Sequence, residues 1–366
     1  MVEVVVVGGG IAGVSAGYYL AVAGCRVTLV EAEEVLAFHA TGRSAALYFE
    51  SYGVPAVRAL TRASRPFFEN PPPELAEVRF LEQRGALWIA RRDQRPRLEA
   101  EFSVGSPTME WLEPAKARDL VPALKPAYLE AAIYEPEALD LDVAAIHQAF
   151  VRGLRQAGGT ILLSSPLTAL NRHGSQWEVV AGANTLSAEV VVNAAGAWGD
   201  EVAHLAGAAP LGLQPCRRTA FMVPGDPSYA PWPLVADIDN EFYFRPDSSQ
   251  VLCSLADETP VPPGDARPEP ADIALAIERI NTATTLDIRT VRSSWAGLRT
   301  FTTDRNMVIG FDPHLPGLFW LVGQGGTGIQ TAPAAGALSA SLIAGTPPPP
   351  QLTAADLQAF APDRFR

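Results

Sequence analysis

Three glycines and one acidic residue near the start of the chain have the spacing of a phosphate-binding turn. Gly8, Gly10 and Gly13 form the pattern G-x-G-x-x-G directly after the apolar run Val4–Val7. In such a turn the first glycine allows the sharp bend, the second lets backbone approach a pyrophosphate, and the third lets a helix pack closely on the sheet. Glu31 follows at the distance where a carboxylate can accept hydrogen bonds from a ribose hydroxyl. This combination predicts a dinucleotide site.

The segments around the turn have the patterns of the strand, helix and strand that must position it. Val4–Val7 is β-branched throughout, which is typical of a strand buried on both faces of a parallel sheet. A helix from Ile11 to Gly24 would present its positive N-terminal end to the diphosphate. Arg26–Val30 is predicted to be a second buried strand that ends at Glu31.

Two later stretches of small residues could also approach a ligand. A buried strand predicted over Glu189–Asn193 runs into the small residues 194–197. The strand predicted over Leu318–Val322 runs into a glycine-rich turn at 323–328, and a helix to about Ala344 follows. This turn would therefore provide a second positive helix end beside the cofactor.

The composition is that of a globular protein large enough for two domains. The chain has 366 residues, of which 19% are charged, and its formal net charge is −12. Lysine occurs only at Lys116 and Lys125, and no basic run marks a surface for nucleic acid or anionic membrane. The three cysteines are isolated and lack C-x-x-C spacing, so neither a disulfide framework nor a metal site is predicted.

The apolar N-terminal stretch has the length of a signal peptide but not its pattern. Glu3 stands where basic residues are expected, and three consecutive glycines interrupt the apolar run. No later segment is apolar for long enough to span a bilayer. We therefore expect a cytoplasmic, reduced protein without a transmembrane segment.

Two regions with a different pattern lie between the segments that suit a parallel sheet. The first contains a helix predicted over Pro55–Asn70 and strand candidates at Gly85–Arg91 and Ala131–Tyr134. The second, Leu211–Ser254, has alternating strands with Pro and Gly turns, as in an antiparallel sheet, and is followed by a helix over Ala271–Ala283.

The sequence therefore predicts α/β structure combined with antiparallel β, in which a nucleotide-binding domain is interrupted by a second domain. The first domain is assigned residues 1–47, 138–210 and 300–366, and the second domain 48–137 and 211–299. A helix predicted over Leu141–Ala157, with Asp140 as its N-cap, leads the chain back into the first domain.

Seven motifs spread over nearly the whole chain are informative in combination. They are G-G-G-I-A-G at 8–13, T-G-R-S-A-A at 41–46, V-N-A-A-G-A-W at 192–198, G-L-Q-P at 212–215, R-R at 217–218, W-A-G-L-R at 295–299 and Q-G-G-T-G-I-Q-T at 324–331. Together they resemble the D-amino acid oxidase superfamily of FAD enzymes, and within it bacterial D-arginine dehydrogenases and similar FAD-dependent D-amino acid dehydrogenases. The resemblance implies an FAD-binding Rossmann-like domain of the glutathione reductase type with an inserted substrate-binding domain.

The resemblance also implies which residues hold the FAD. They are Gly8, Gly10, Ala12, Gly13, Glu31, Ala32, Thr41, Gly42, Arg43, Ser44, Ala45, Ala46, Leu47, Leu167, Gly196, Gly325, Gly326, Thr327, Gly328, Ile329 and Gln330. The loop at 41–47 would flank the pyrophosphate and flavin, and the last glycine-rich turn would approach the flavin. Relatives that bond flavin to cysteine carry that cysteine near this turn. Because no cysteine follows Cys253, FAD is expected to be non-covalent.

For the substrate, the resemblance implies a carboxylate site. Its residues would be Tyr52, Arg218, Tyr243, Arg299 and Gly326. The two arginines would bind the α-carboxylate, Tyr243 would donate to the same group, and Tyr52 would close the pocket. A bidentate contact between Arg and carboxylate fixes both position and orientation. Alternation along a strand lets only one of two adjacent residues point inward, so Arg217 remains an alternative to Arg218.

Two positions beside the implied substrate side chain depart from the resemblance. Where D-arginine dehydrogenases have a histidine and a glutamate, this chain has Leu47 and Ala86. A cationic side chain entering there would lose its charged partner and keep its desolvation cost. Glu50 or Glu82 could supply a carboxylate from the rim, but both lie in stretches typical of solvated charge. The pocket is therefore predicted to be apolar.

The leading hypothesis is FAD-dependent oxidative deamination of D-amino acids with neutral or apolar side chains, by hydride transfer from Cα to flavin N5, giving 2-oxo acids and ammonia. One alternative is a glycine- or sarcosine-type amine oxidase that uses oxygen. Several sarcosine oxidase relatives hold a lysine beside the flavin, and neither lysine of this chain lies in a matching motif. Another alternative is a flavin domain acting on modified tRNA, which the acidic balance disfavours. The electron acceptor (quinone, another carrier or oxygen) stays open, and the five histidines are predicted to be structural.

Overall fold

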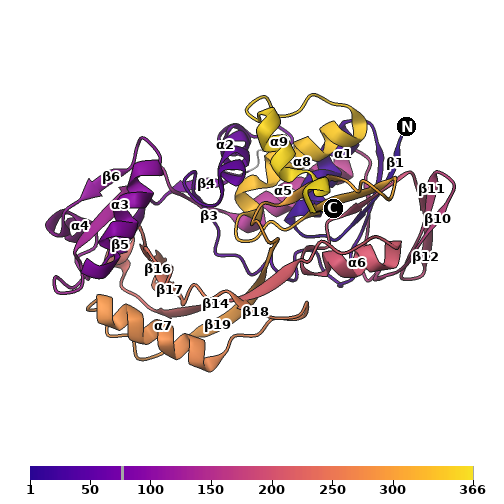
Figure 1. Ribbon diagram of the computed structural model, residues 1–366. Helices are drawn as coiled ribbons and strands as arrows, with labels where there is room; N and C mark the ends of the chain where they lie inside the picture. Colours follow the sequence, from indigo (N-terminus) through magenta and orange to yellow (C-terminus); the bar gives the residue numbers. More distant parts are fainter. Residues whose placement is uncertain (76–77, 366) are drawn as a thin grey trace.

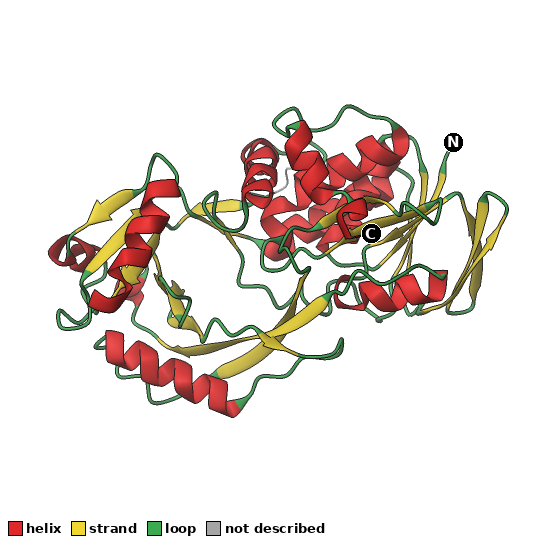
Figure 2. Cartoon of the chain, in the orientation of Figure 1, coloured by secondary structure: helices red, strands yellow, loops and turns green. Residues whose placement is uncertain are grey.

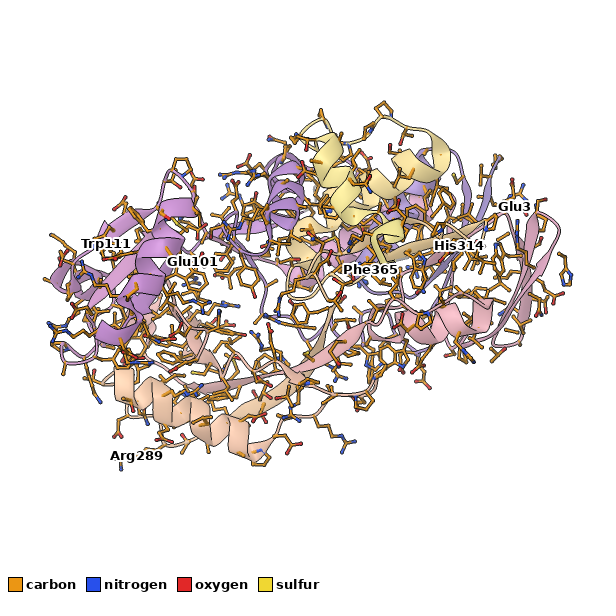
Figure 3. All side chains as sticks on the ribbon, viewed as in Figure 1. Glu3, Glu101, Trp111, Arg289, His314 and Phe365 are labelled. Carbon is orange, nitrogen blue, oxygen red and sulfur yellow. The ribbon has the colours of Figure 1, made fainter. Side chains whose placement is uncertain are left out.

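The computed structural model describes residues 1–75 and 78–365 and shows a molecule of two lobes (Figure 1). One lobe holds both ends of the chain, and the other is built from middle segments (Figure 1). Glu3, His314 and Phe365 mark the first lobe in Figure 3, while Glu101 and Trp111 mark the far end of the second. No helix in residues 1–75 or 78–365 is both long enough and apolar enough to cross a membrane.

A six-stranded sheet forms the centre of the first lobe. Its strands in spatial order are β20 (Val308–Phe311), β21 (Leu318–Val322), β13 (Val190–Asn193), β1 (Glu3–Val7), β2 (Arg26–Val30) and β9 (Thr160–Leu162). β1 is parallel to both of its neighbours. Because successive side chains of a strand point to opposite faces, Val4 and Val6 join the helical layer while Val5 and Val7 join the layer behind the sheet. Both faces of β1 are buried, as its β-branched sequence predicted.

A layer of helices covers one face of this sheet. They are α1 (Ile11–Val22), α2 (Pro55–Glu69), α5 (Val143–Gln156) and α8 (Gly328–Ala344), and α9 (Ala354–Phe360) lies beside them. α8 can approach α1 closely because Gly336 has no side chain, and a Cβ there would lie 2.8 Å from the Tyr19 ring. Phe67 of α2 stacks on Phe150 of α5 with ring centroids 5.0 Å apart. The predicted division assigned α2 to the second domain, whereas its apolar face packs in this layer.

The opposite face is covered by a three-stranded antiparallel sheet and one short helix, which the sequence analysis did not anticipate. The elements are β10 (Leu167–His173), β11 (Gln176–Ala181), β12 (Asn184–Ala188) and α6 (Gly199–Ala206). Trp177 and Val202 from these elements pack with Val5 and Val7 of β1. The parallel sheet is thus enclosed between two layers.

A nine-stranded, mostly antiparallel sheet forms the second lobe. Its strands in spatial order are β18 (Thr259–Pro260), β14 (Gln214–Pro224), β17 (Gln250–Ser254), β16 (Tyr243–Asp247), β15 (Leu234–Asp237), β5 (Ala86–Ala90), β7 (Ala131–Glu135) and β6 (Glu110–Leu112), and β19 (Ser293–Phe301) also pairs with β14. The helices of this lobe are α3 (Arg95–Val104), α4 (Pro114–Leu120) and α7 (Pro270–Ala283). The long pair β14 and β19 extends from this lobe toward the first (Figure 2). This pair can therefore carry side chains to a site between the lobes.

The remaining elements are short. A small antiparallel sheet lies where the chain passes between the lobes and consists of β3 (Leu47–Tyr48), β8 (Leu139–Leu141) and β4 (Leu81–Gln83). Single 3₁₀ turns occur at Arg92–Gln94, Gly196–Trp198, Pro227–Tyr229 and Pro362–Phe365. All strands of the six-stranded sheet come from the ranges assigned to the first domain, while the domain boundaries themselves stay a prediction.

The N-cap of α5 is Asp142, not Asp140 as the sequence analysis expected. Asp142 Oδ1 accepts the N–H of Ala145 at 2.8 Å. Asp140 lies in β8, where its carboxylate pairs with Arg84 at 2.6 Å. Both aspartates precede the same apolar stripe, so the sequence alone does not distinguish them. The pairing of β8 with its neighbours makes Asp140 a strand residue and leaves Asp142 as the cap.

Replacing Asp142 with Ala should lower the free energy of unfolding by about 1 kcal/mol, because the Ala145 N–H loses its acceptor. Asp142→Asn keeps a capping oxygen and should stay close to the unmodified protein. Urea unfolding of the three proteins, followed by circular dichroism, measures the difference. An Asp142→Ala protein as stable as the unmodified one would contradict the cap.

Candidate active site

A cavity of about 520 Å³ is lined by residues of both lobes. At one end lie the first glycine-rich turn and Glu31, and at the other lie Arg218 and Arg299. The first end is formed where parallel strands such as β1 and β2 reach their carboxyl ends, the edge at which open α/β sheets bind ligands.

The first glycine-rich turn has the geometry that its spacing predicted. Gly8 has a φ of +109°, and a Cβ there would lie 2.6 Å from the carbonyl oxygen of Ala194. A Cβ on Gly13 would collide with the carbonyl of Gly8, so α1 can pack on the turn only with glycine at 13. At Gly10 the nearest atom to an added Cβ is Thr41 Oγ1 at 3.2 Å, and this hydroxyl accepts the first N–H of α1 at 3.0 Å.

The Glu31 carboxylate is held by two backbone donors. Oε2 accepts the N–H of Gly9 at 2.6 Å, and Oε1 accepts the N–H of Glu33 at 2.9 Å. His147 Nε2 lies 3.0 Å from the Gly9 carbonyl oxygen, and burial lowers the pKa of His147, which favours a neutral ring donating this N–H. Each Glu31 oxygen keeps a lone pair, so the carboxylate can still accept a ribose hydroxyl.

The last glycine-rich turn brings backbone under the second end of the cavity. Gly325 has a φ of +54°. A Cβ on Gly326 would lie 2.7 Å from Arg299 Nη1, so a larger residue there would displace this guanidinium. α8 begins at Gly328, and its first residues line the cavity, which places a positive helix end there.

Most residues that the resemblance implied for the cofactor line the cavity, and three do not: Gly13, Gly42 and Thr327. Gly13 and Gly42 instead allow close backbone contacts, since a Cβ on Gly42 would collide with the carbonyl of Ala37. Thr327 is buried, and its hydroxyl donates to the Gln324 carbonyl at 2.8 Å. These three residues shape the turns and do not face the cavity.

Arg43 lines the cavity, but its guanidinium is already occupied by protein groups. It donates to the carbonyls of Phe38, Ala266 and Ala296 and pairs with Asp265 at 2.6 Å. A guanidinium with these partners is not free to bind a phosphate. Arg43 instead ties the loop at 41–46 to β19 and to the loop at 265–266.

Arg218 and Arg299 stand on neighbouring strands at the second end of the cavity. In the register of β14 with β19, Arg299 is opposite Cys216, two residues from Arg218, so both arginines share one face of the sheet. Arg217 lies on the other face, where its Nη2 donates to Asp272 of α7 at 2.8 Å. The structure therefore brings Arg218, and not Arg217, to the cavity.

Arg299 has little neutralising charge around it. Within the described residues its guanidinium has one hydrogen-bond partner, the Tyr52 hydroxyl at 3.4 Å, and it forms no ion pair. The hydroxyl-bearing Tyr243 lines the same part of the cavity. Burial acts to lower the pKa of Arg299, but Tyr52, Tyr243 and Glu258 outweigh it and raise that pKa, so the group stays charged.

The carboxylate of Glu258, which helps to raise the pKa of Arg299, is shared between two other arginines. It lies 3.4 Å from Arg218 and only 2.7 Å from the exposed Arg305. Burial and the adjacent Arg299 lower the pKa of Arg218, because both disfavour its charged form. This end of the cavity therefore has surplus positive charge.

The wall beside the two arginines is apolar. Its residues are Leu47, Phe49, Trp88, Leu234 and Ala236. Ala86, predicted to contact the substrate side chain, is fully buried and does not line the cavity. It lies behind the wall, and Trp88, two residues further along β5, reaches the cavity instead. Phe49 and Trp88 were not predicted as cavity residues. Each lies two residues after a position that was predicted, Leu47 or Ala86, and could have been found by the alternation of side chains along a strand.

Neither glutamate considered for the rim lines the cavity. Glu50 pairs with Arg65 at 2.9 Å and accepts from the Tyr48 hydroxyl at 2.9 Å. Glu82 is exposed on β4. The apolar wall therefore receives no carboxylate from these two residues.

One carboxylate cluster elsewhere was also missed, because its members converge only through a turn after β15. Asp237, Asp239 and Glu241 lie close enough together to hold a cation. Gln94 already donates to both aspartates, and Glu241 pairs with Arg91 at 2.9 Å. The three carboxylates thus already have hydrogen-bond and ion-pair partners within the protein.

The cofactor end of the cavity fits an adenine dinucleotide with a flavin. Two glycine-rich turns expose backbone without side chains, and each leads into a helix N-terminus that can bind negatively charged groups. The Glu31 carboxylate is positioned to accept a ribose hydroxyl. Residues 3–342 match the model of the DAO family, described as FAD dependent oxidoreductase. The chain belongs to the DAO family. Its cofactor is FAD.

Relatives of this DAO-family chain act on several small amines. A glycine oxidase of Bacillus licheniformis is 27% identical over 364 residues, which is 94% of each chain. The mitochondrial dimethylglycine dehydrogenase of Rattus norvegicus is 28% identical over 266 residues, covering 68% of this chain. The chain spans only 30% of that relative's length.

Solved structures share the fold along almost the whole chain. L-proline dehydrogenase from P. horikoshii has a TM-score of 0.86 at 22% identity, covering 100% of this chain and 97% of that one. Glycine oxidase from Geobacillus kaustophilus has a TM-score of 0.86 at 23% identity, covering 99% and 98%. The FAD-binding Rossmann-like fold with an antiparallel second sheet is confirmed, while the closer resemblance to D-arginine dehydrogenases stays a prediction.

Replacing Gly10 with Val should abolish FAD retention, because the side chain would fill the place where the pyrophosphate meets backbone and would crowd Thr41. Gly264→Val is the matched control, since a Cβ there has no neighbour within 4 Å. Flavin absorption after gel filtration measures retention. A folded Gly10→Val protein that keeps its FAD would contradict the cofactor site.

Proposed function

We propose that this DAO-family protein oxidises α-amino acids with neutral, apolar side chains, in particular those of the D configuration, to imino acids that water converts to 2-oxo acids and ammonia. The family assignment establishes FAD-dependent oxidoreductase chemistry, and the substrate is our proposal. The observation that carries it is Arg299, a cation without an ion-pair partner among the described residues, on the wall of the cavity that holds FAD.

A substrate carboxylate would complete the environment of Arg299. An arginine in a partly buried site is costly without an anion, and a carboxylate matches its two parallel N–H donors. Arg218 lies beside it, and the hydroxyls of Tyr52 and Tyr243 line the same place. A carboxylate held there would be fixed in both position and rotation, which directs the rest of the substrate along the cavity.

The surplus positive charge also affects the protonation state of the substrate nitrogen. Arg218 and Arg299 disfavour an ammonium group nearby, so the amine is expected to be neutral after losing its proton to water. Its lone pair can then form the C=N bond, and no protein base is required. When bound, FAD supplies the acceptor for the two electrons that leave Cα with the hydrogen.

The apolar wall supports a side chain without charge. Leu47, Phe49 and Trp88 present hydrocarbon and aromatic surface next to the arginines. Burial of one apolar side chain is worth about 2 to 3 kcal/mol, whereas a cation there would be uncompensated. The preference for the D configuration rests on the resemblance of the sequence motifs.

A glycine- or sarcosine-type amine oxidase is the second candidate. The Bacillus licheniformis glycine oxidase, similar over 94% of both chains, favours it. Against it, neither lysine reaches the cavity: Lys116 is exposed on α4, and Lys125 donates to the Asn281 carbonyl at 2.6 Å. Hydrogen peroxide production with glycine or sarcosine in air, compared with reduction of a quinone analogue, separates the two candidates.

Replacing Arg299 with Met should raise KM and slow flavin reduction while FAD stays bound. Loss of a charged hydrogen bond in a dry site costs about 3 kcal/mol, or roughly a hundredfold in kcat/KM. The control is Arg289→Met, which removes an exposed arginine at the outer end of the second lobe (Figure 3). An unchanged kcat/KM in Arg299→Met would assign the residue to structure alone.

The apolar wall predicts a large preference for D-leucine, D-methionine or D-phenylalanine over D-arginine and D-lysine, of more than about a hundredfold in kcat/KM. Leu47→Glu should narrow this gap by placing a carboxylate at the wall, and Leu47→Met should not. Ala86→Glu is expected to destabilise the protein, because Ala86 is fully buried. Steady-state kinetics test the ratio, and equal turnover of D-arginine and D-leucine would refute the apolar wall.

A further inference from the structure

A buried carboxylate, Glu135, lies behind the substrate end of the cavity. It ends β7, its side chain is 1% exposed, and it does not line the cavity. Burial raises the pKa of this carboxyl group, while hydrogen bonds from Ser51 and Trp88 oppose the rise. A buried carboxylate is stable only when hydrogen-bond donors stabilise it. The residues that donate to Glu135 therefore indicate what it holds in place.

One donor belongs to the segment that carries a proposed substrate residue. Ser51 Oγ lies 2.6 Å from Glu135 Oε2. Ser51 directly precedes Tyr52, whose hydroxyl accepts from Arg299 at 3.4 Å. On the neighbouring strand β5, Ala86 pairs with Glu135, and Trp88 of the apolar wall lies two residues further along the same face. Glu135 therefore contacts the segment that carries Tyr52 and lies one strand away from the apolar wall.

The segment 49–53 has no regular secondary structure and is anchored by side chains. At its start, Gln330 of α8 accepts the N–H of Phe49 at 3.0 Å and donates to its carbonyl at 3.2 Å. At its end, Arg58 donates to the Gly53 carbonyl at 2.7 Å.

Between these anchors two side chains leave the segment in different directions. Glu50 pairs with Arg65 of α2, whereas Ser51 reaches Glu135 in the other lobe. The hydrogen bond to Glu135 thus joins this segment to the sheet behind the substrate end, where Phe49 also packs against Trp88.

We infer that Glu135 is a positioning residue for substrate binding: by holding Ser51, it sets the adjacent Tyr52 against Arg299. The inference rests on the proposed function, because it concerns the residues proposed to bind the amino acid. Glu135 itself touches neither substrate nor FAD.

The test measures carboxylate binding to the FAD-loaded protein. The probe is 4-methylpentanoate, which is leucine without its amine, titrated while the flavin absorption spectrum is recorded. Ser51→Ala and Glu135→Gln should each raise the Kd about fivefold, because each weakens one hydrogen bond that places Tyr52. Ser103→Ala, which removes an exposed serine hydroxyl on α3, should leave the Kd unchanged.

A double-mutant cycle with Tyr52→Phe separates positioning from a general loss of stability. If Ser51 and Glu135 act through Tyr52, the effect of Ser51→Ala should shrink to less than twofold in the Tyr52→Phe protein. The same fivefold effect in both backgrounds, or a lowered unfolding midpoint with an unchanged Kd, would overturn the inference. If the unmodified protein bound no 4-methylpentanoate, the proposed function would fail, and the inference with it.

Discussion

The positive charge of Arg299 is the constraint around which the second end of the cavity is arranged. Gly326 of the last glycine-rich turn leaves room for it, the neighbouring strand contributes a second arginine, and the segment 49–53 contributes a hydroxyl. The described residues leave its charge without an ion pair. In a cavity whose other end is built for FAD, this arrangement is suited to bring a carboxylate beside the flavin.

The two ends of the cavity belong to different sheets, so their relative position depends on the contacts between the lobes. Arg43 spans this boundary, because it is anchored in the loop after the first βαβ unit and donates to Ala296 of β19. The Trp295 ring N–H donates back to the Arg43 carbonyl at 2.9 Å. The strand that carries Arg299 is thereby fixed directly to the loop along the cofactor.

The first βαβ unit and the glycine-rich turns could be predicted from sequence, because each depends on local spacing. Gly13 packs against Gly8 within one turn, and Glu31 accepts the N–H of Gly9 at the end of a single strand–helix–strand unit. The choice between Arg217 and Arg218 required the strand register, and Ala86 was misplaced because the cavity face of β5 is reached at Trp88. Three partners of Arg43, namely Asp265, Ala266 and Ala296, lie more than 200 residues away in sequence and leave no local pattern.

If Arg299 selects substrates by their carboxylate, two amines that differ only in that group should differ in flavin reduction, and comparing them is the most direct test. FAD-loaded protein is mixed without oxygen with D-leucine or with 3-methylbutylamine, and flavin bleaching is followed by absorption. D-leucine should bleach the flavin, and 3-methylbutylamine should leave it oxidised over the same time. Equal bleaching by both compounds would contradict the claim.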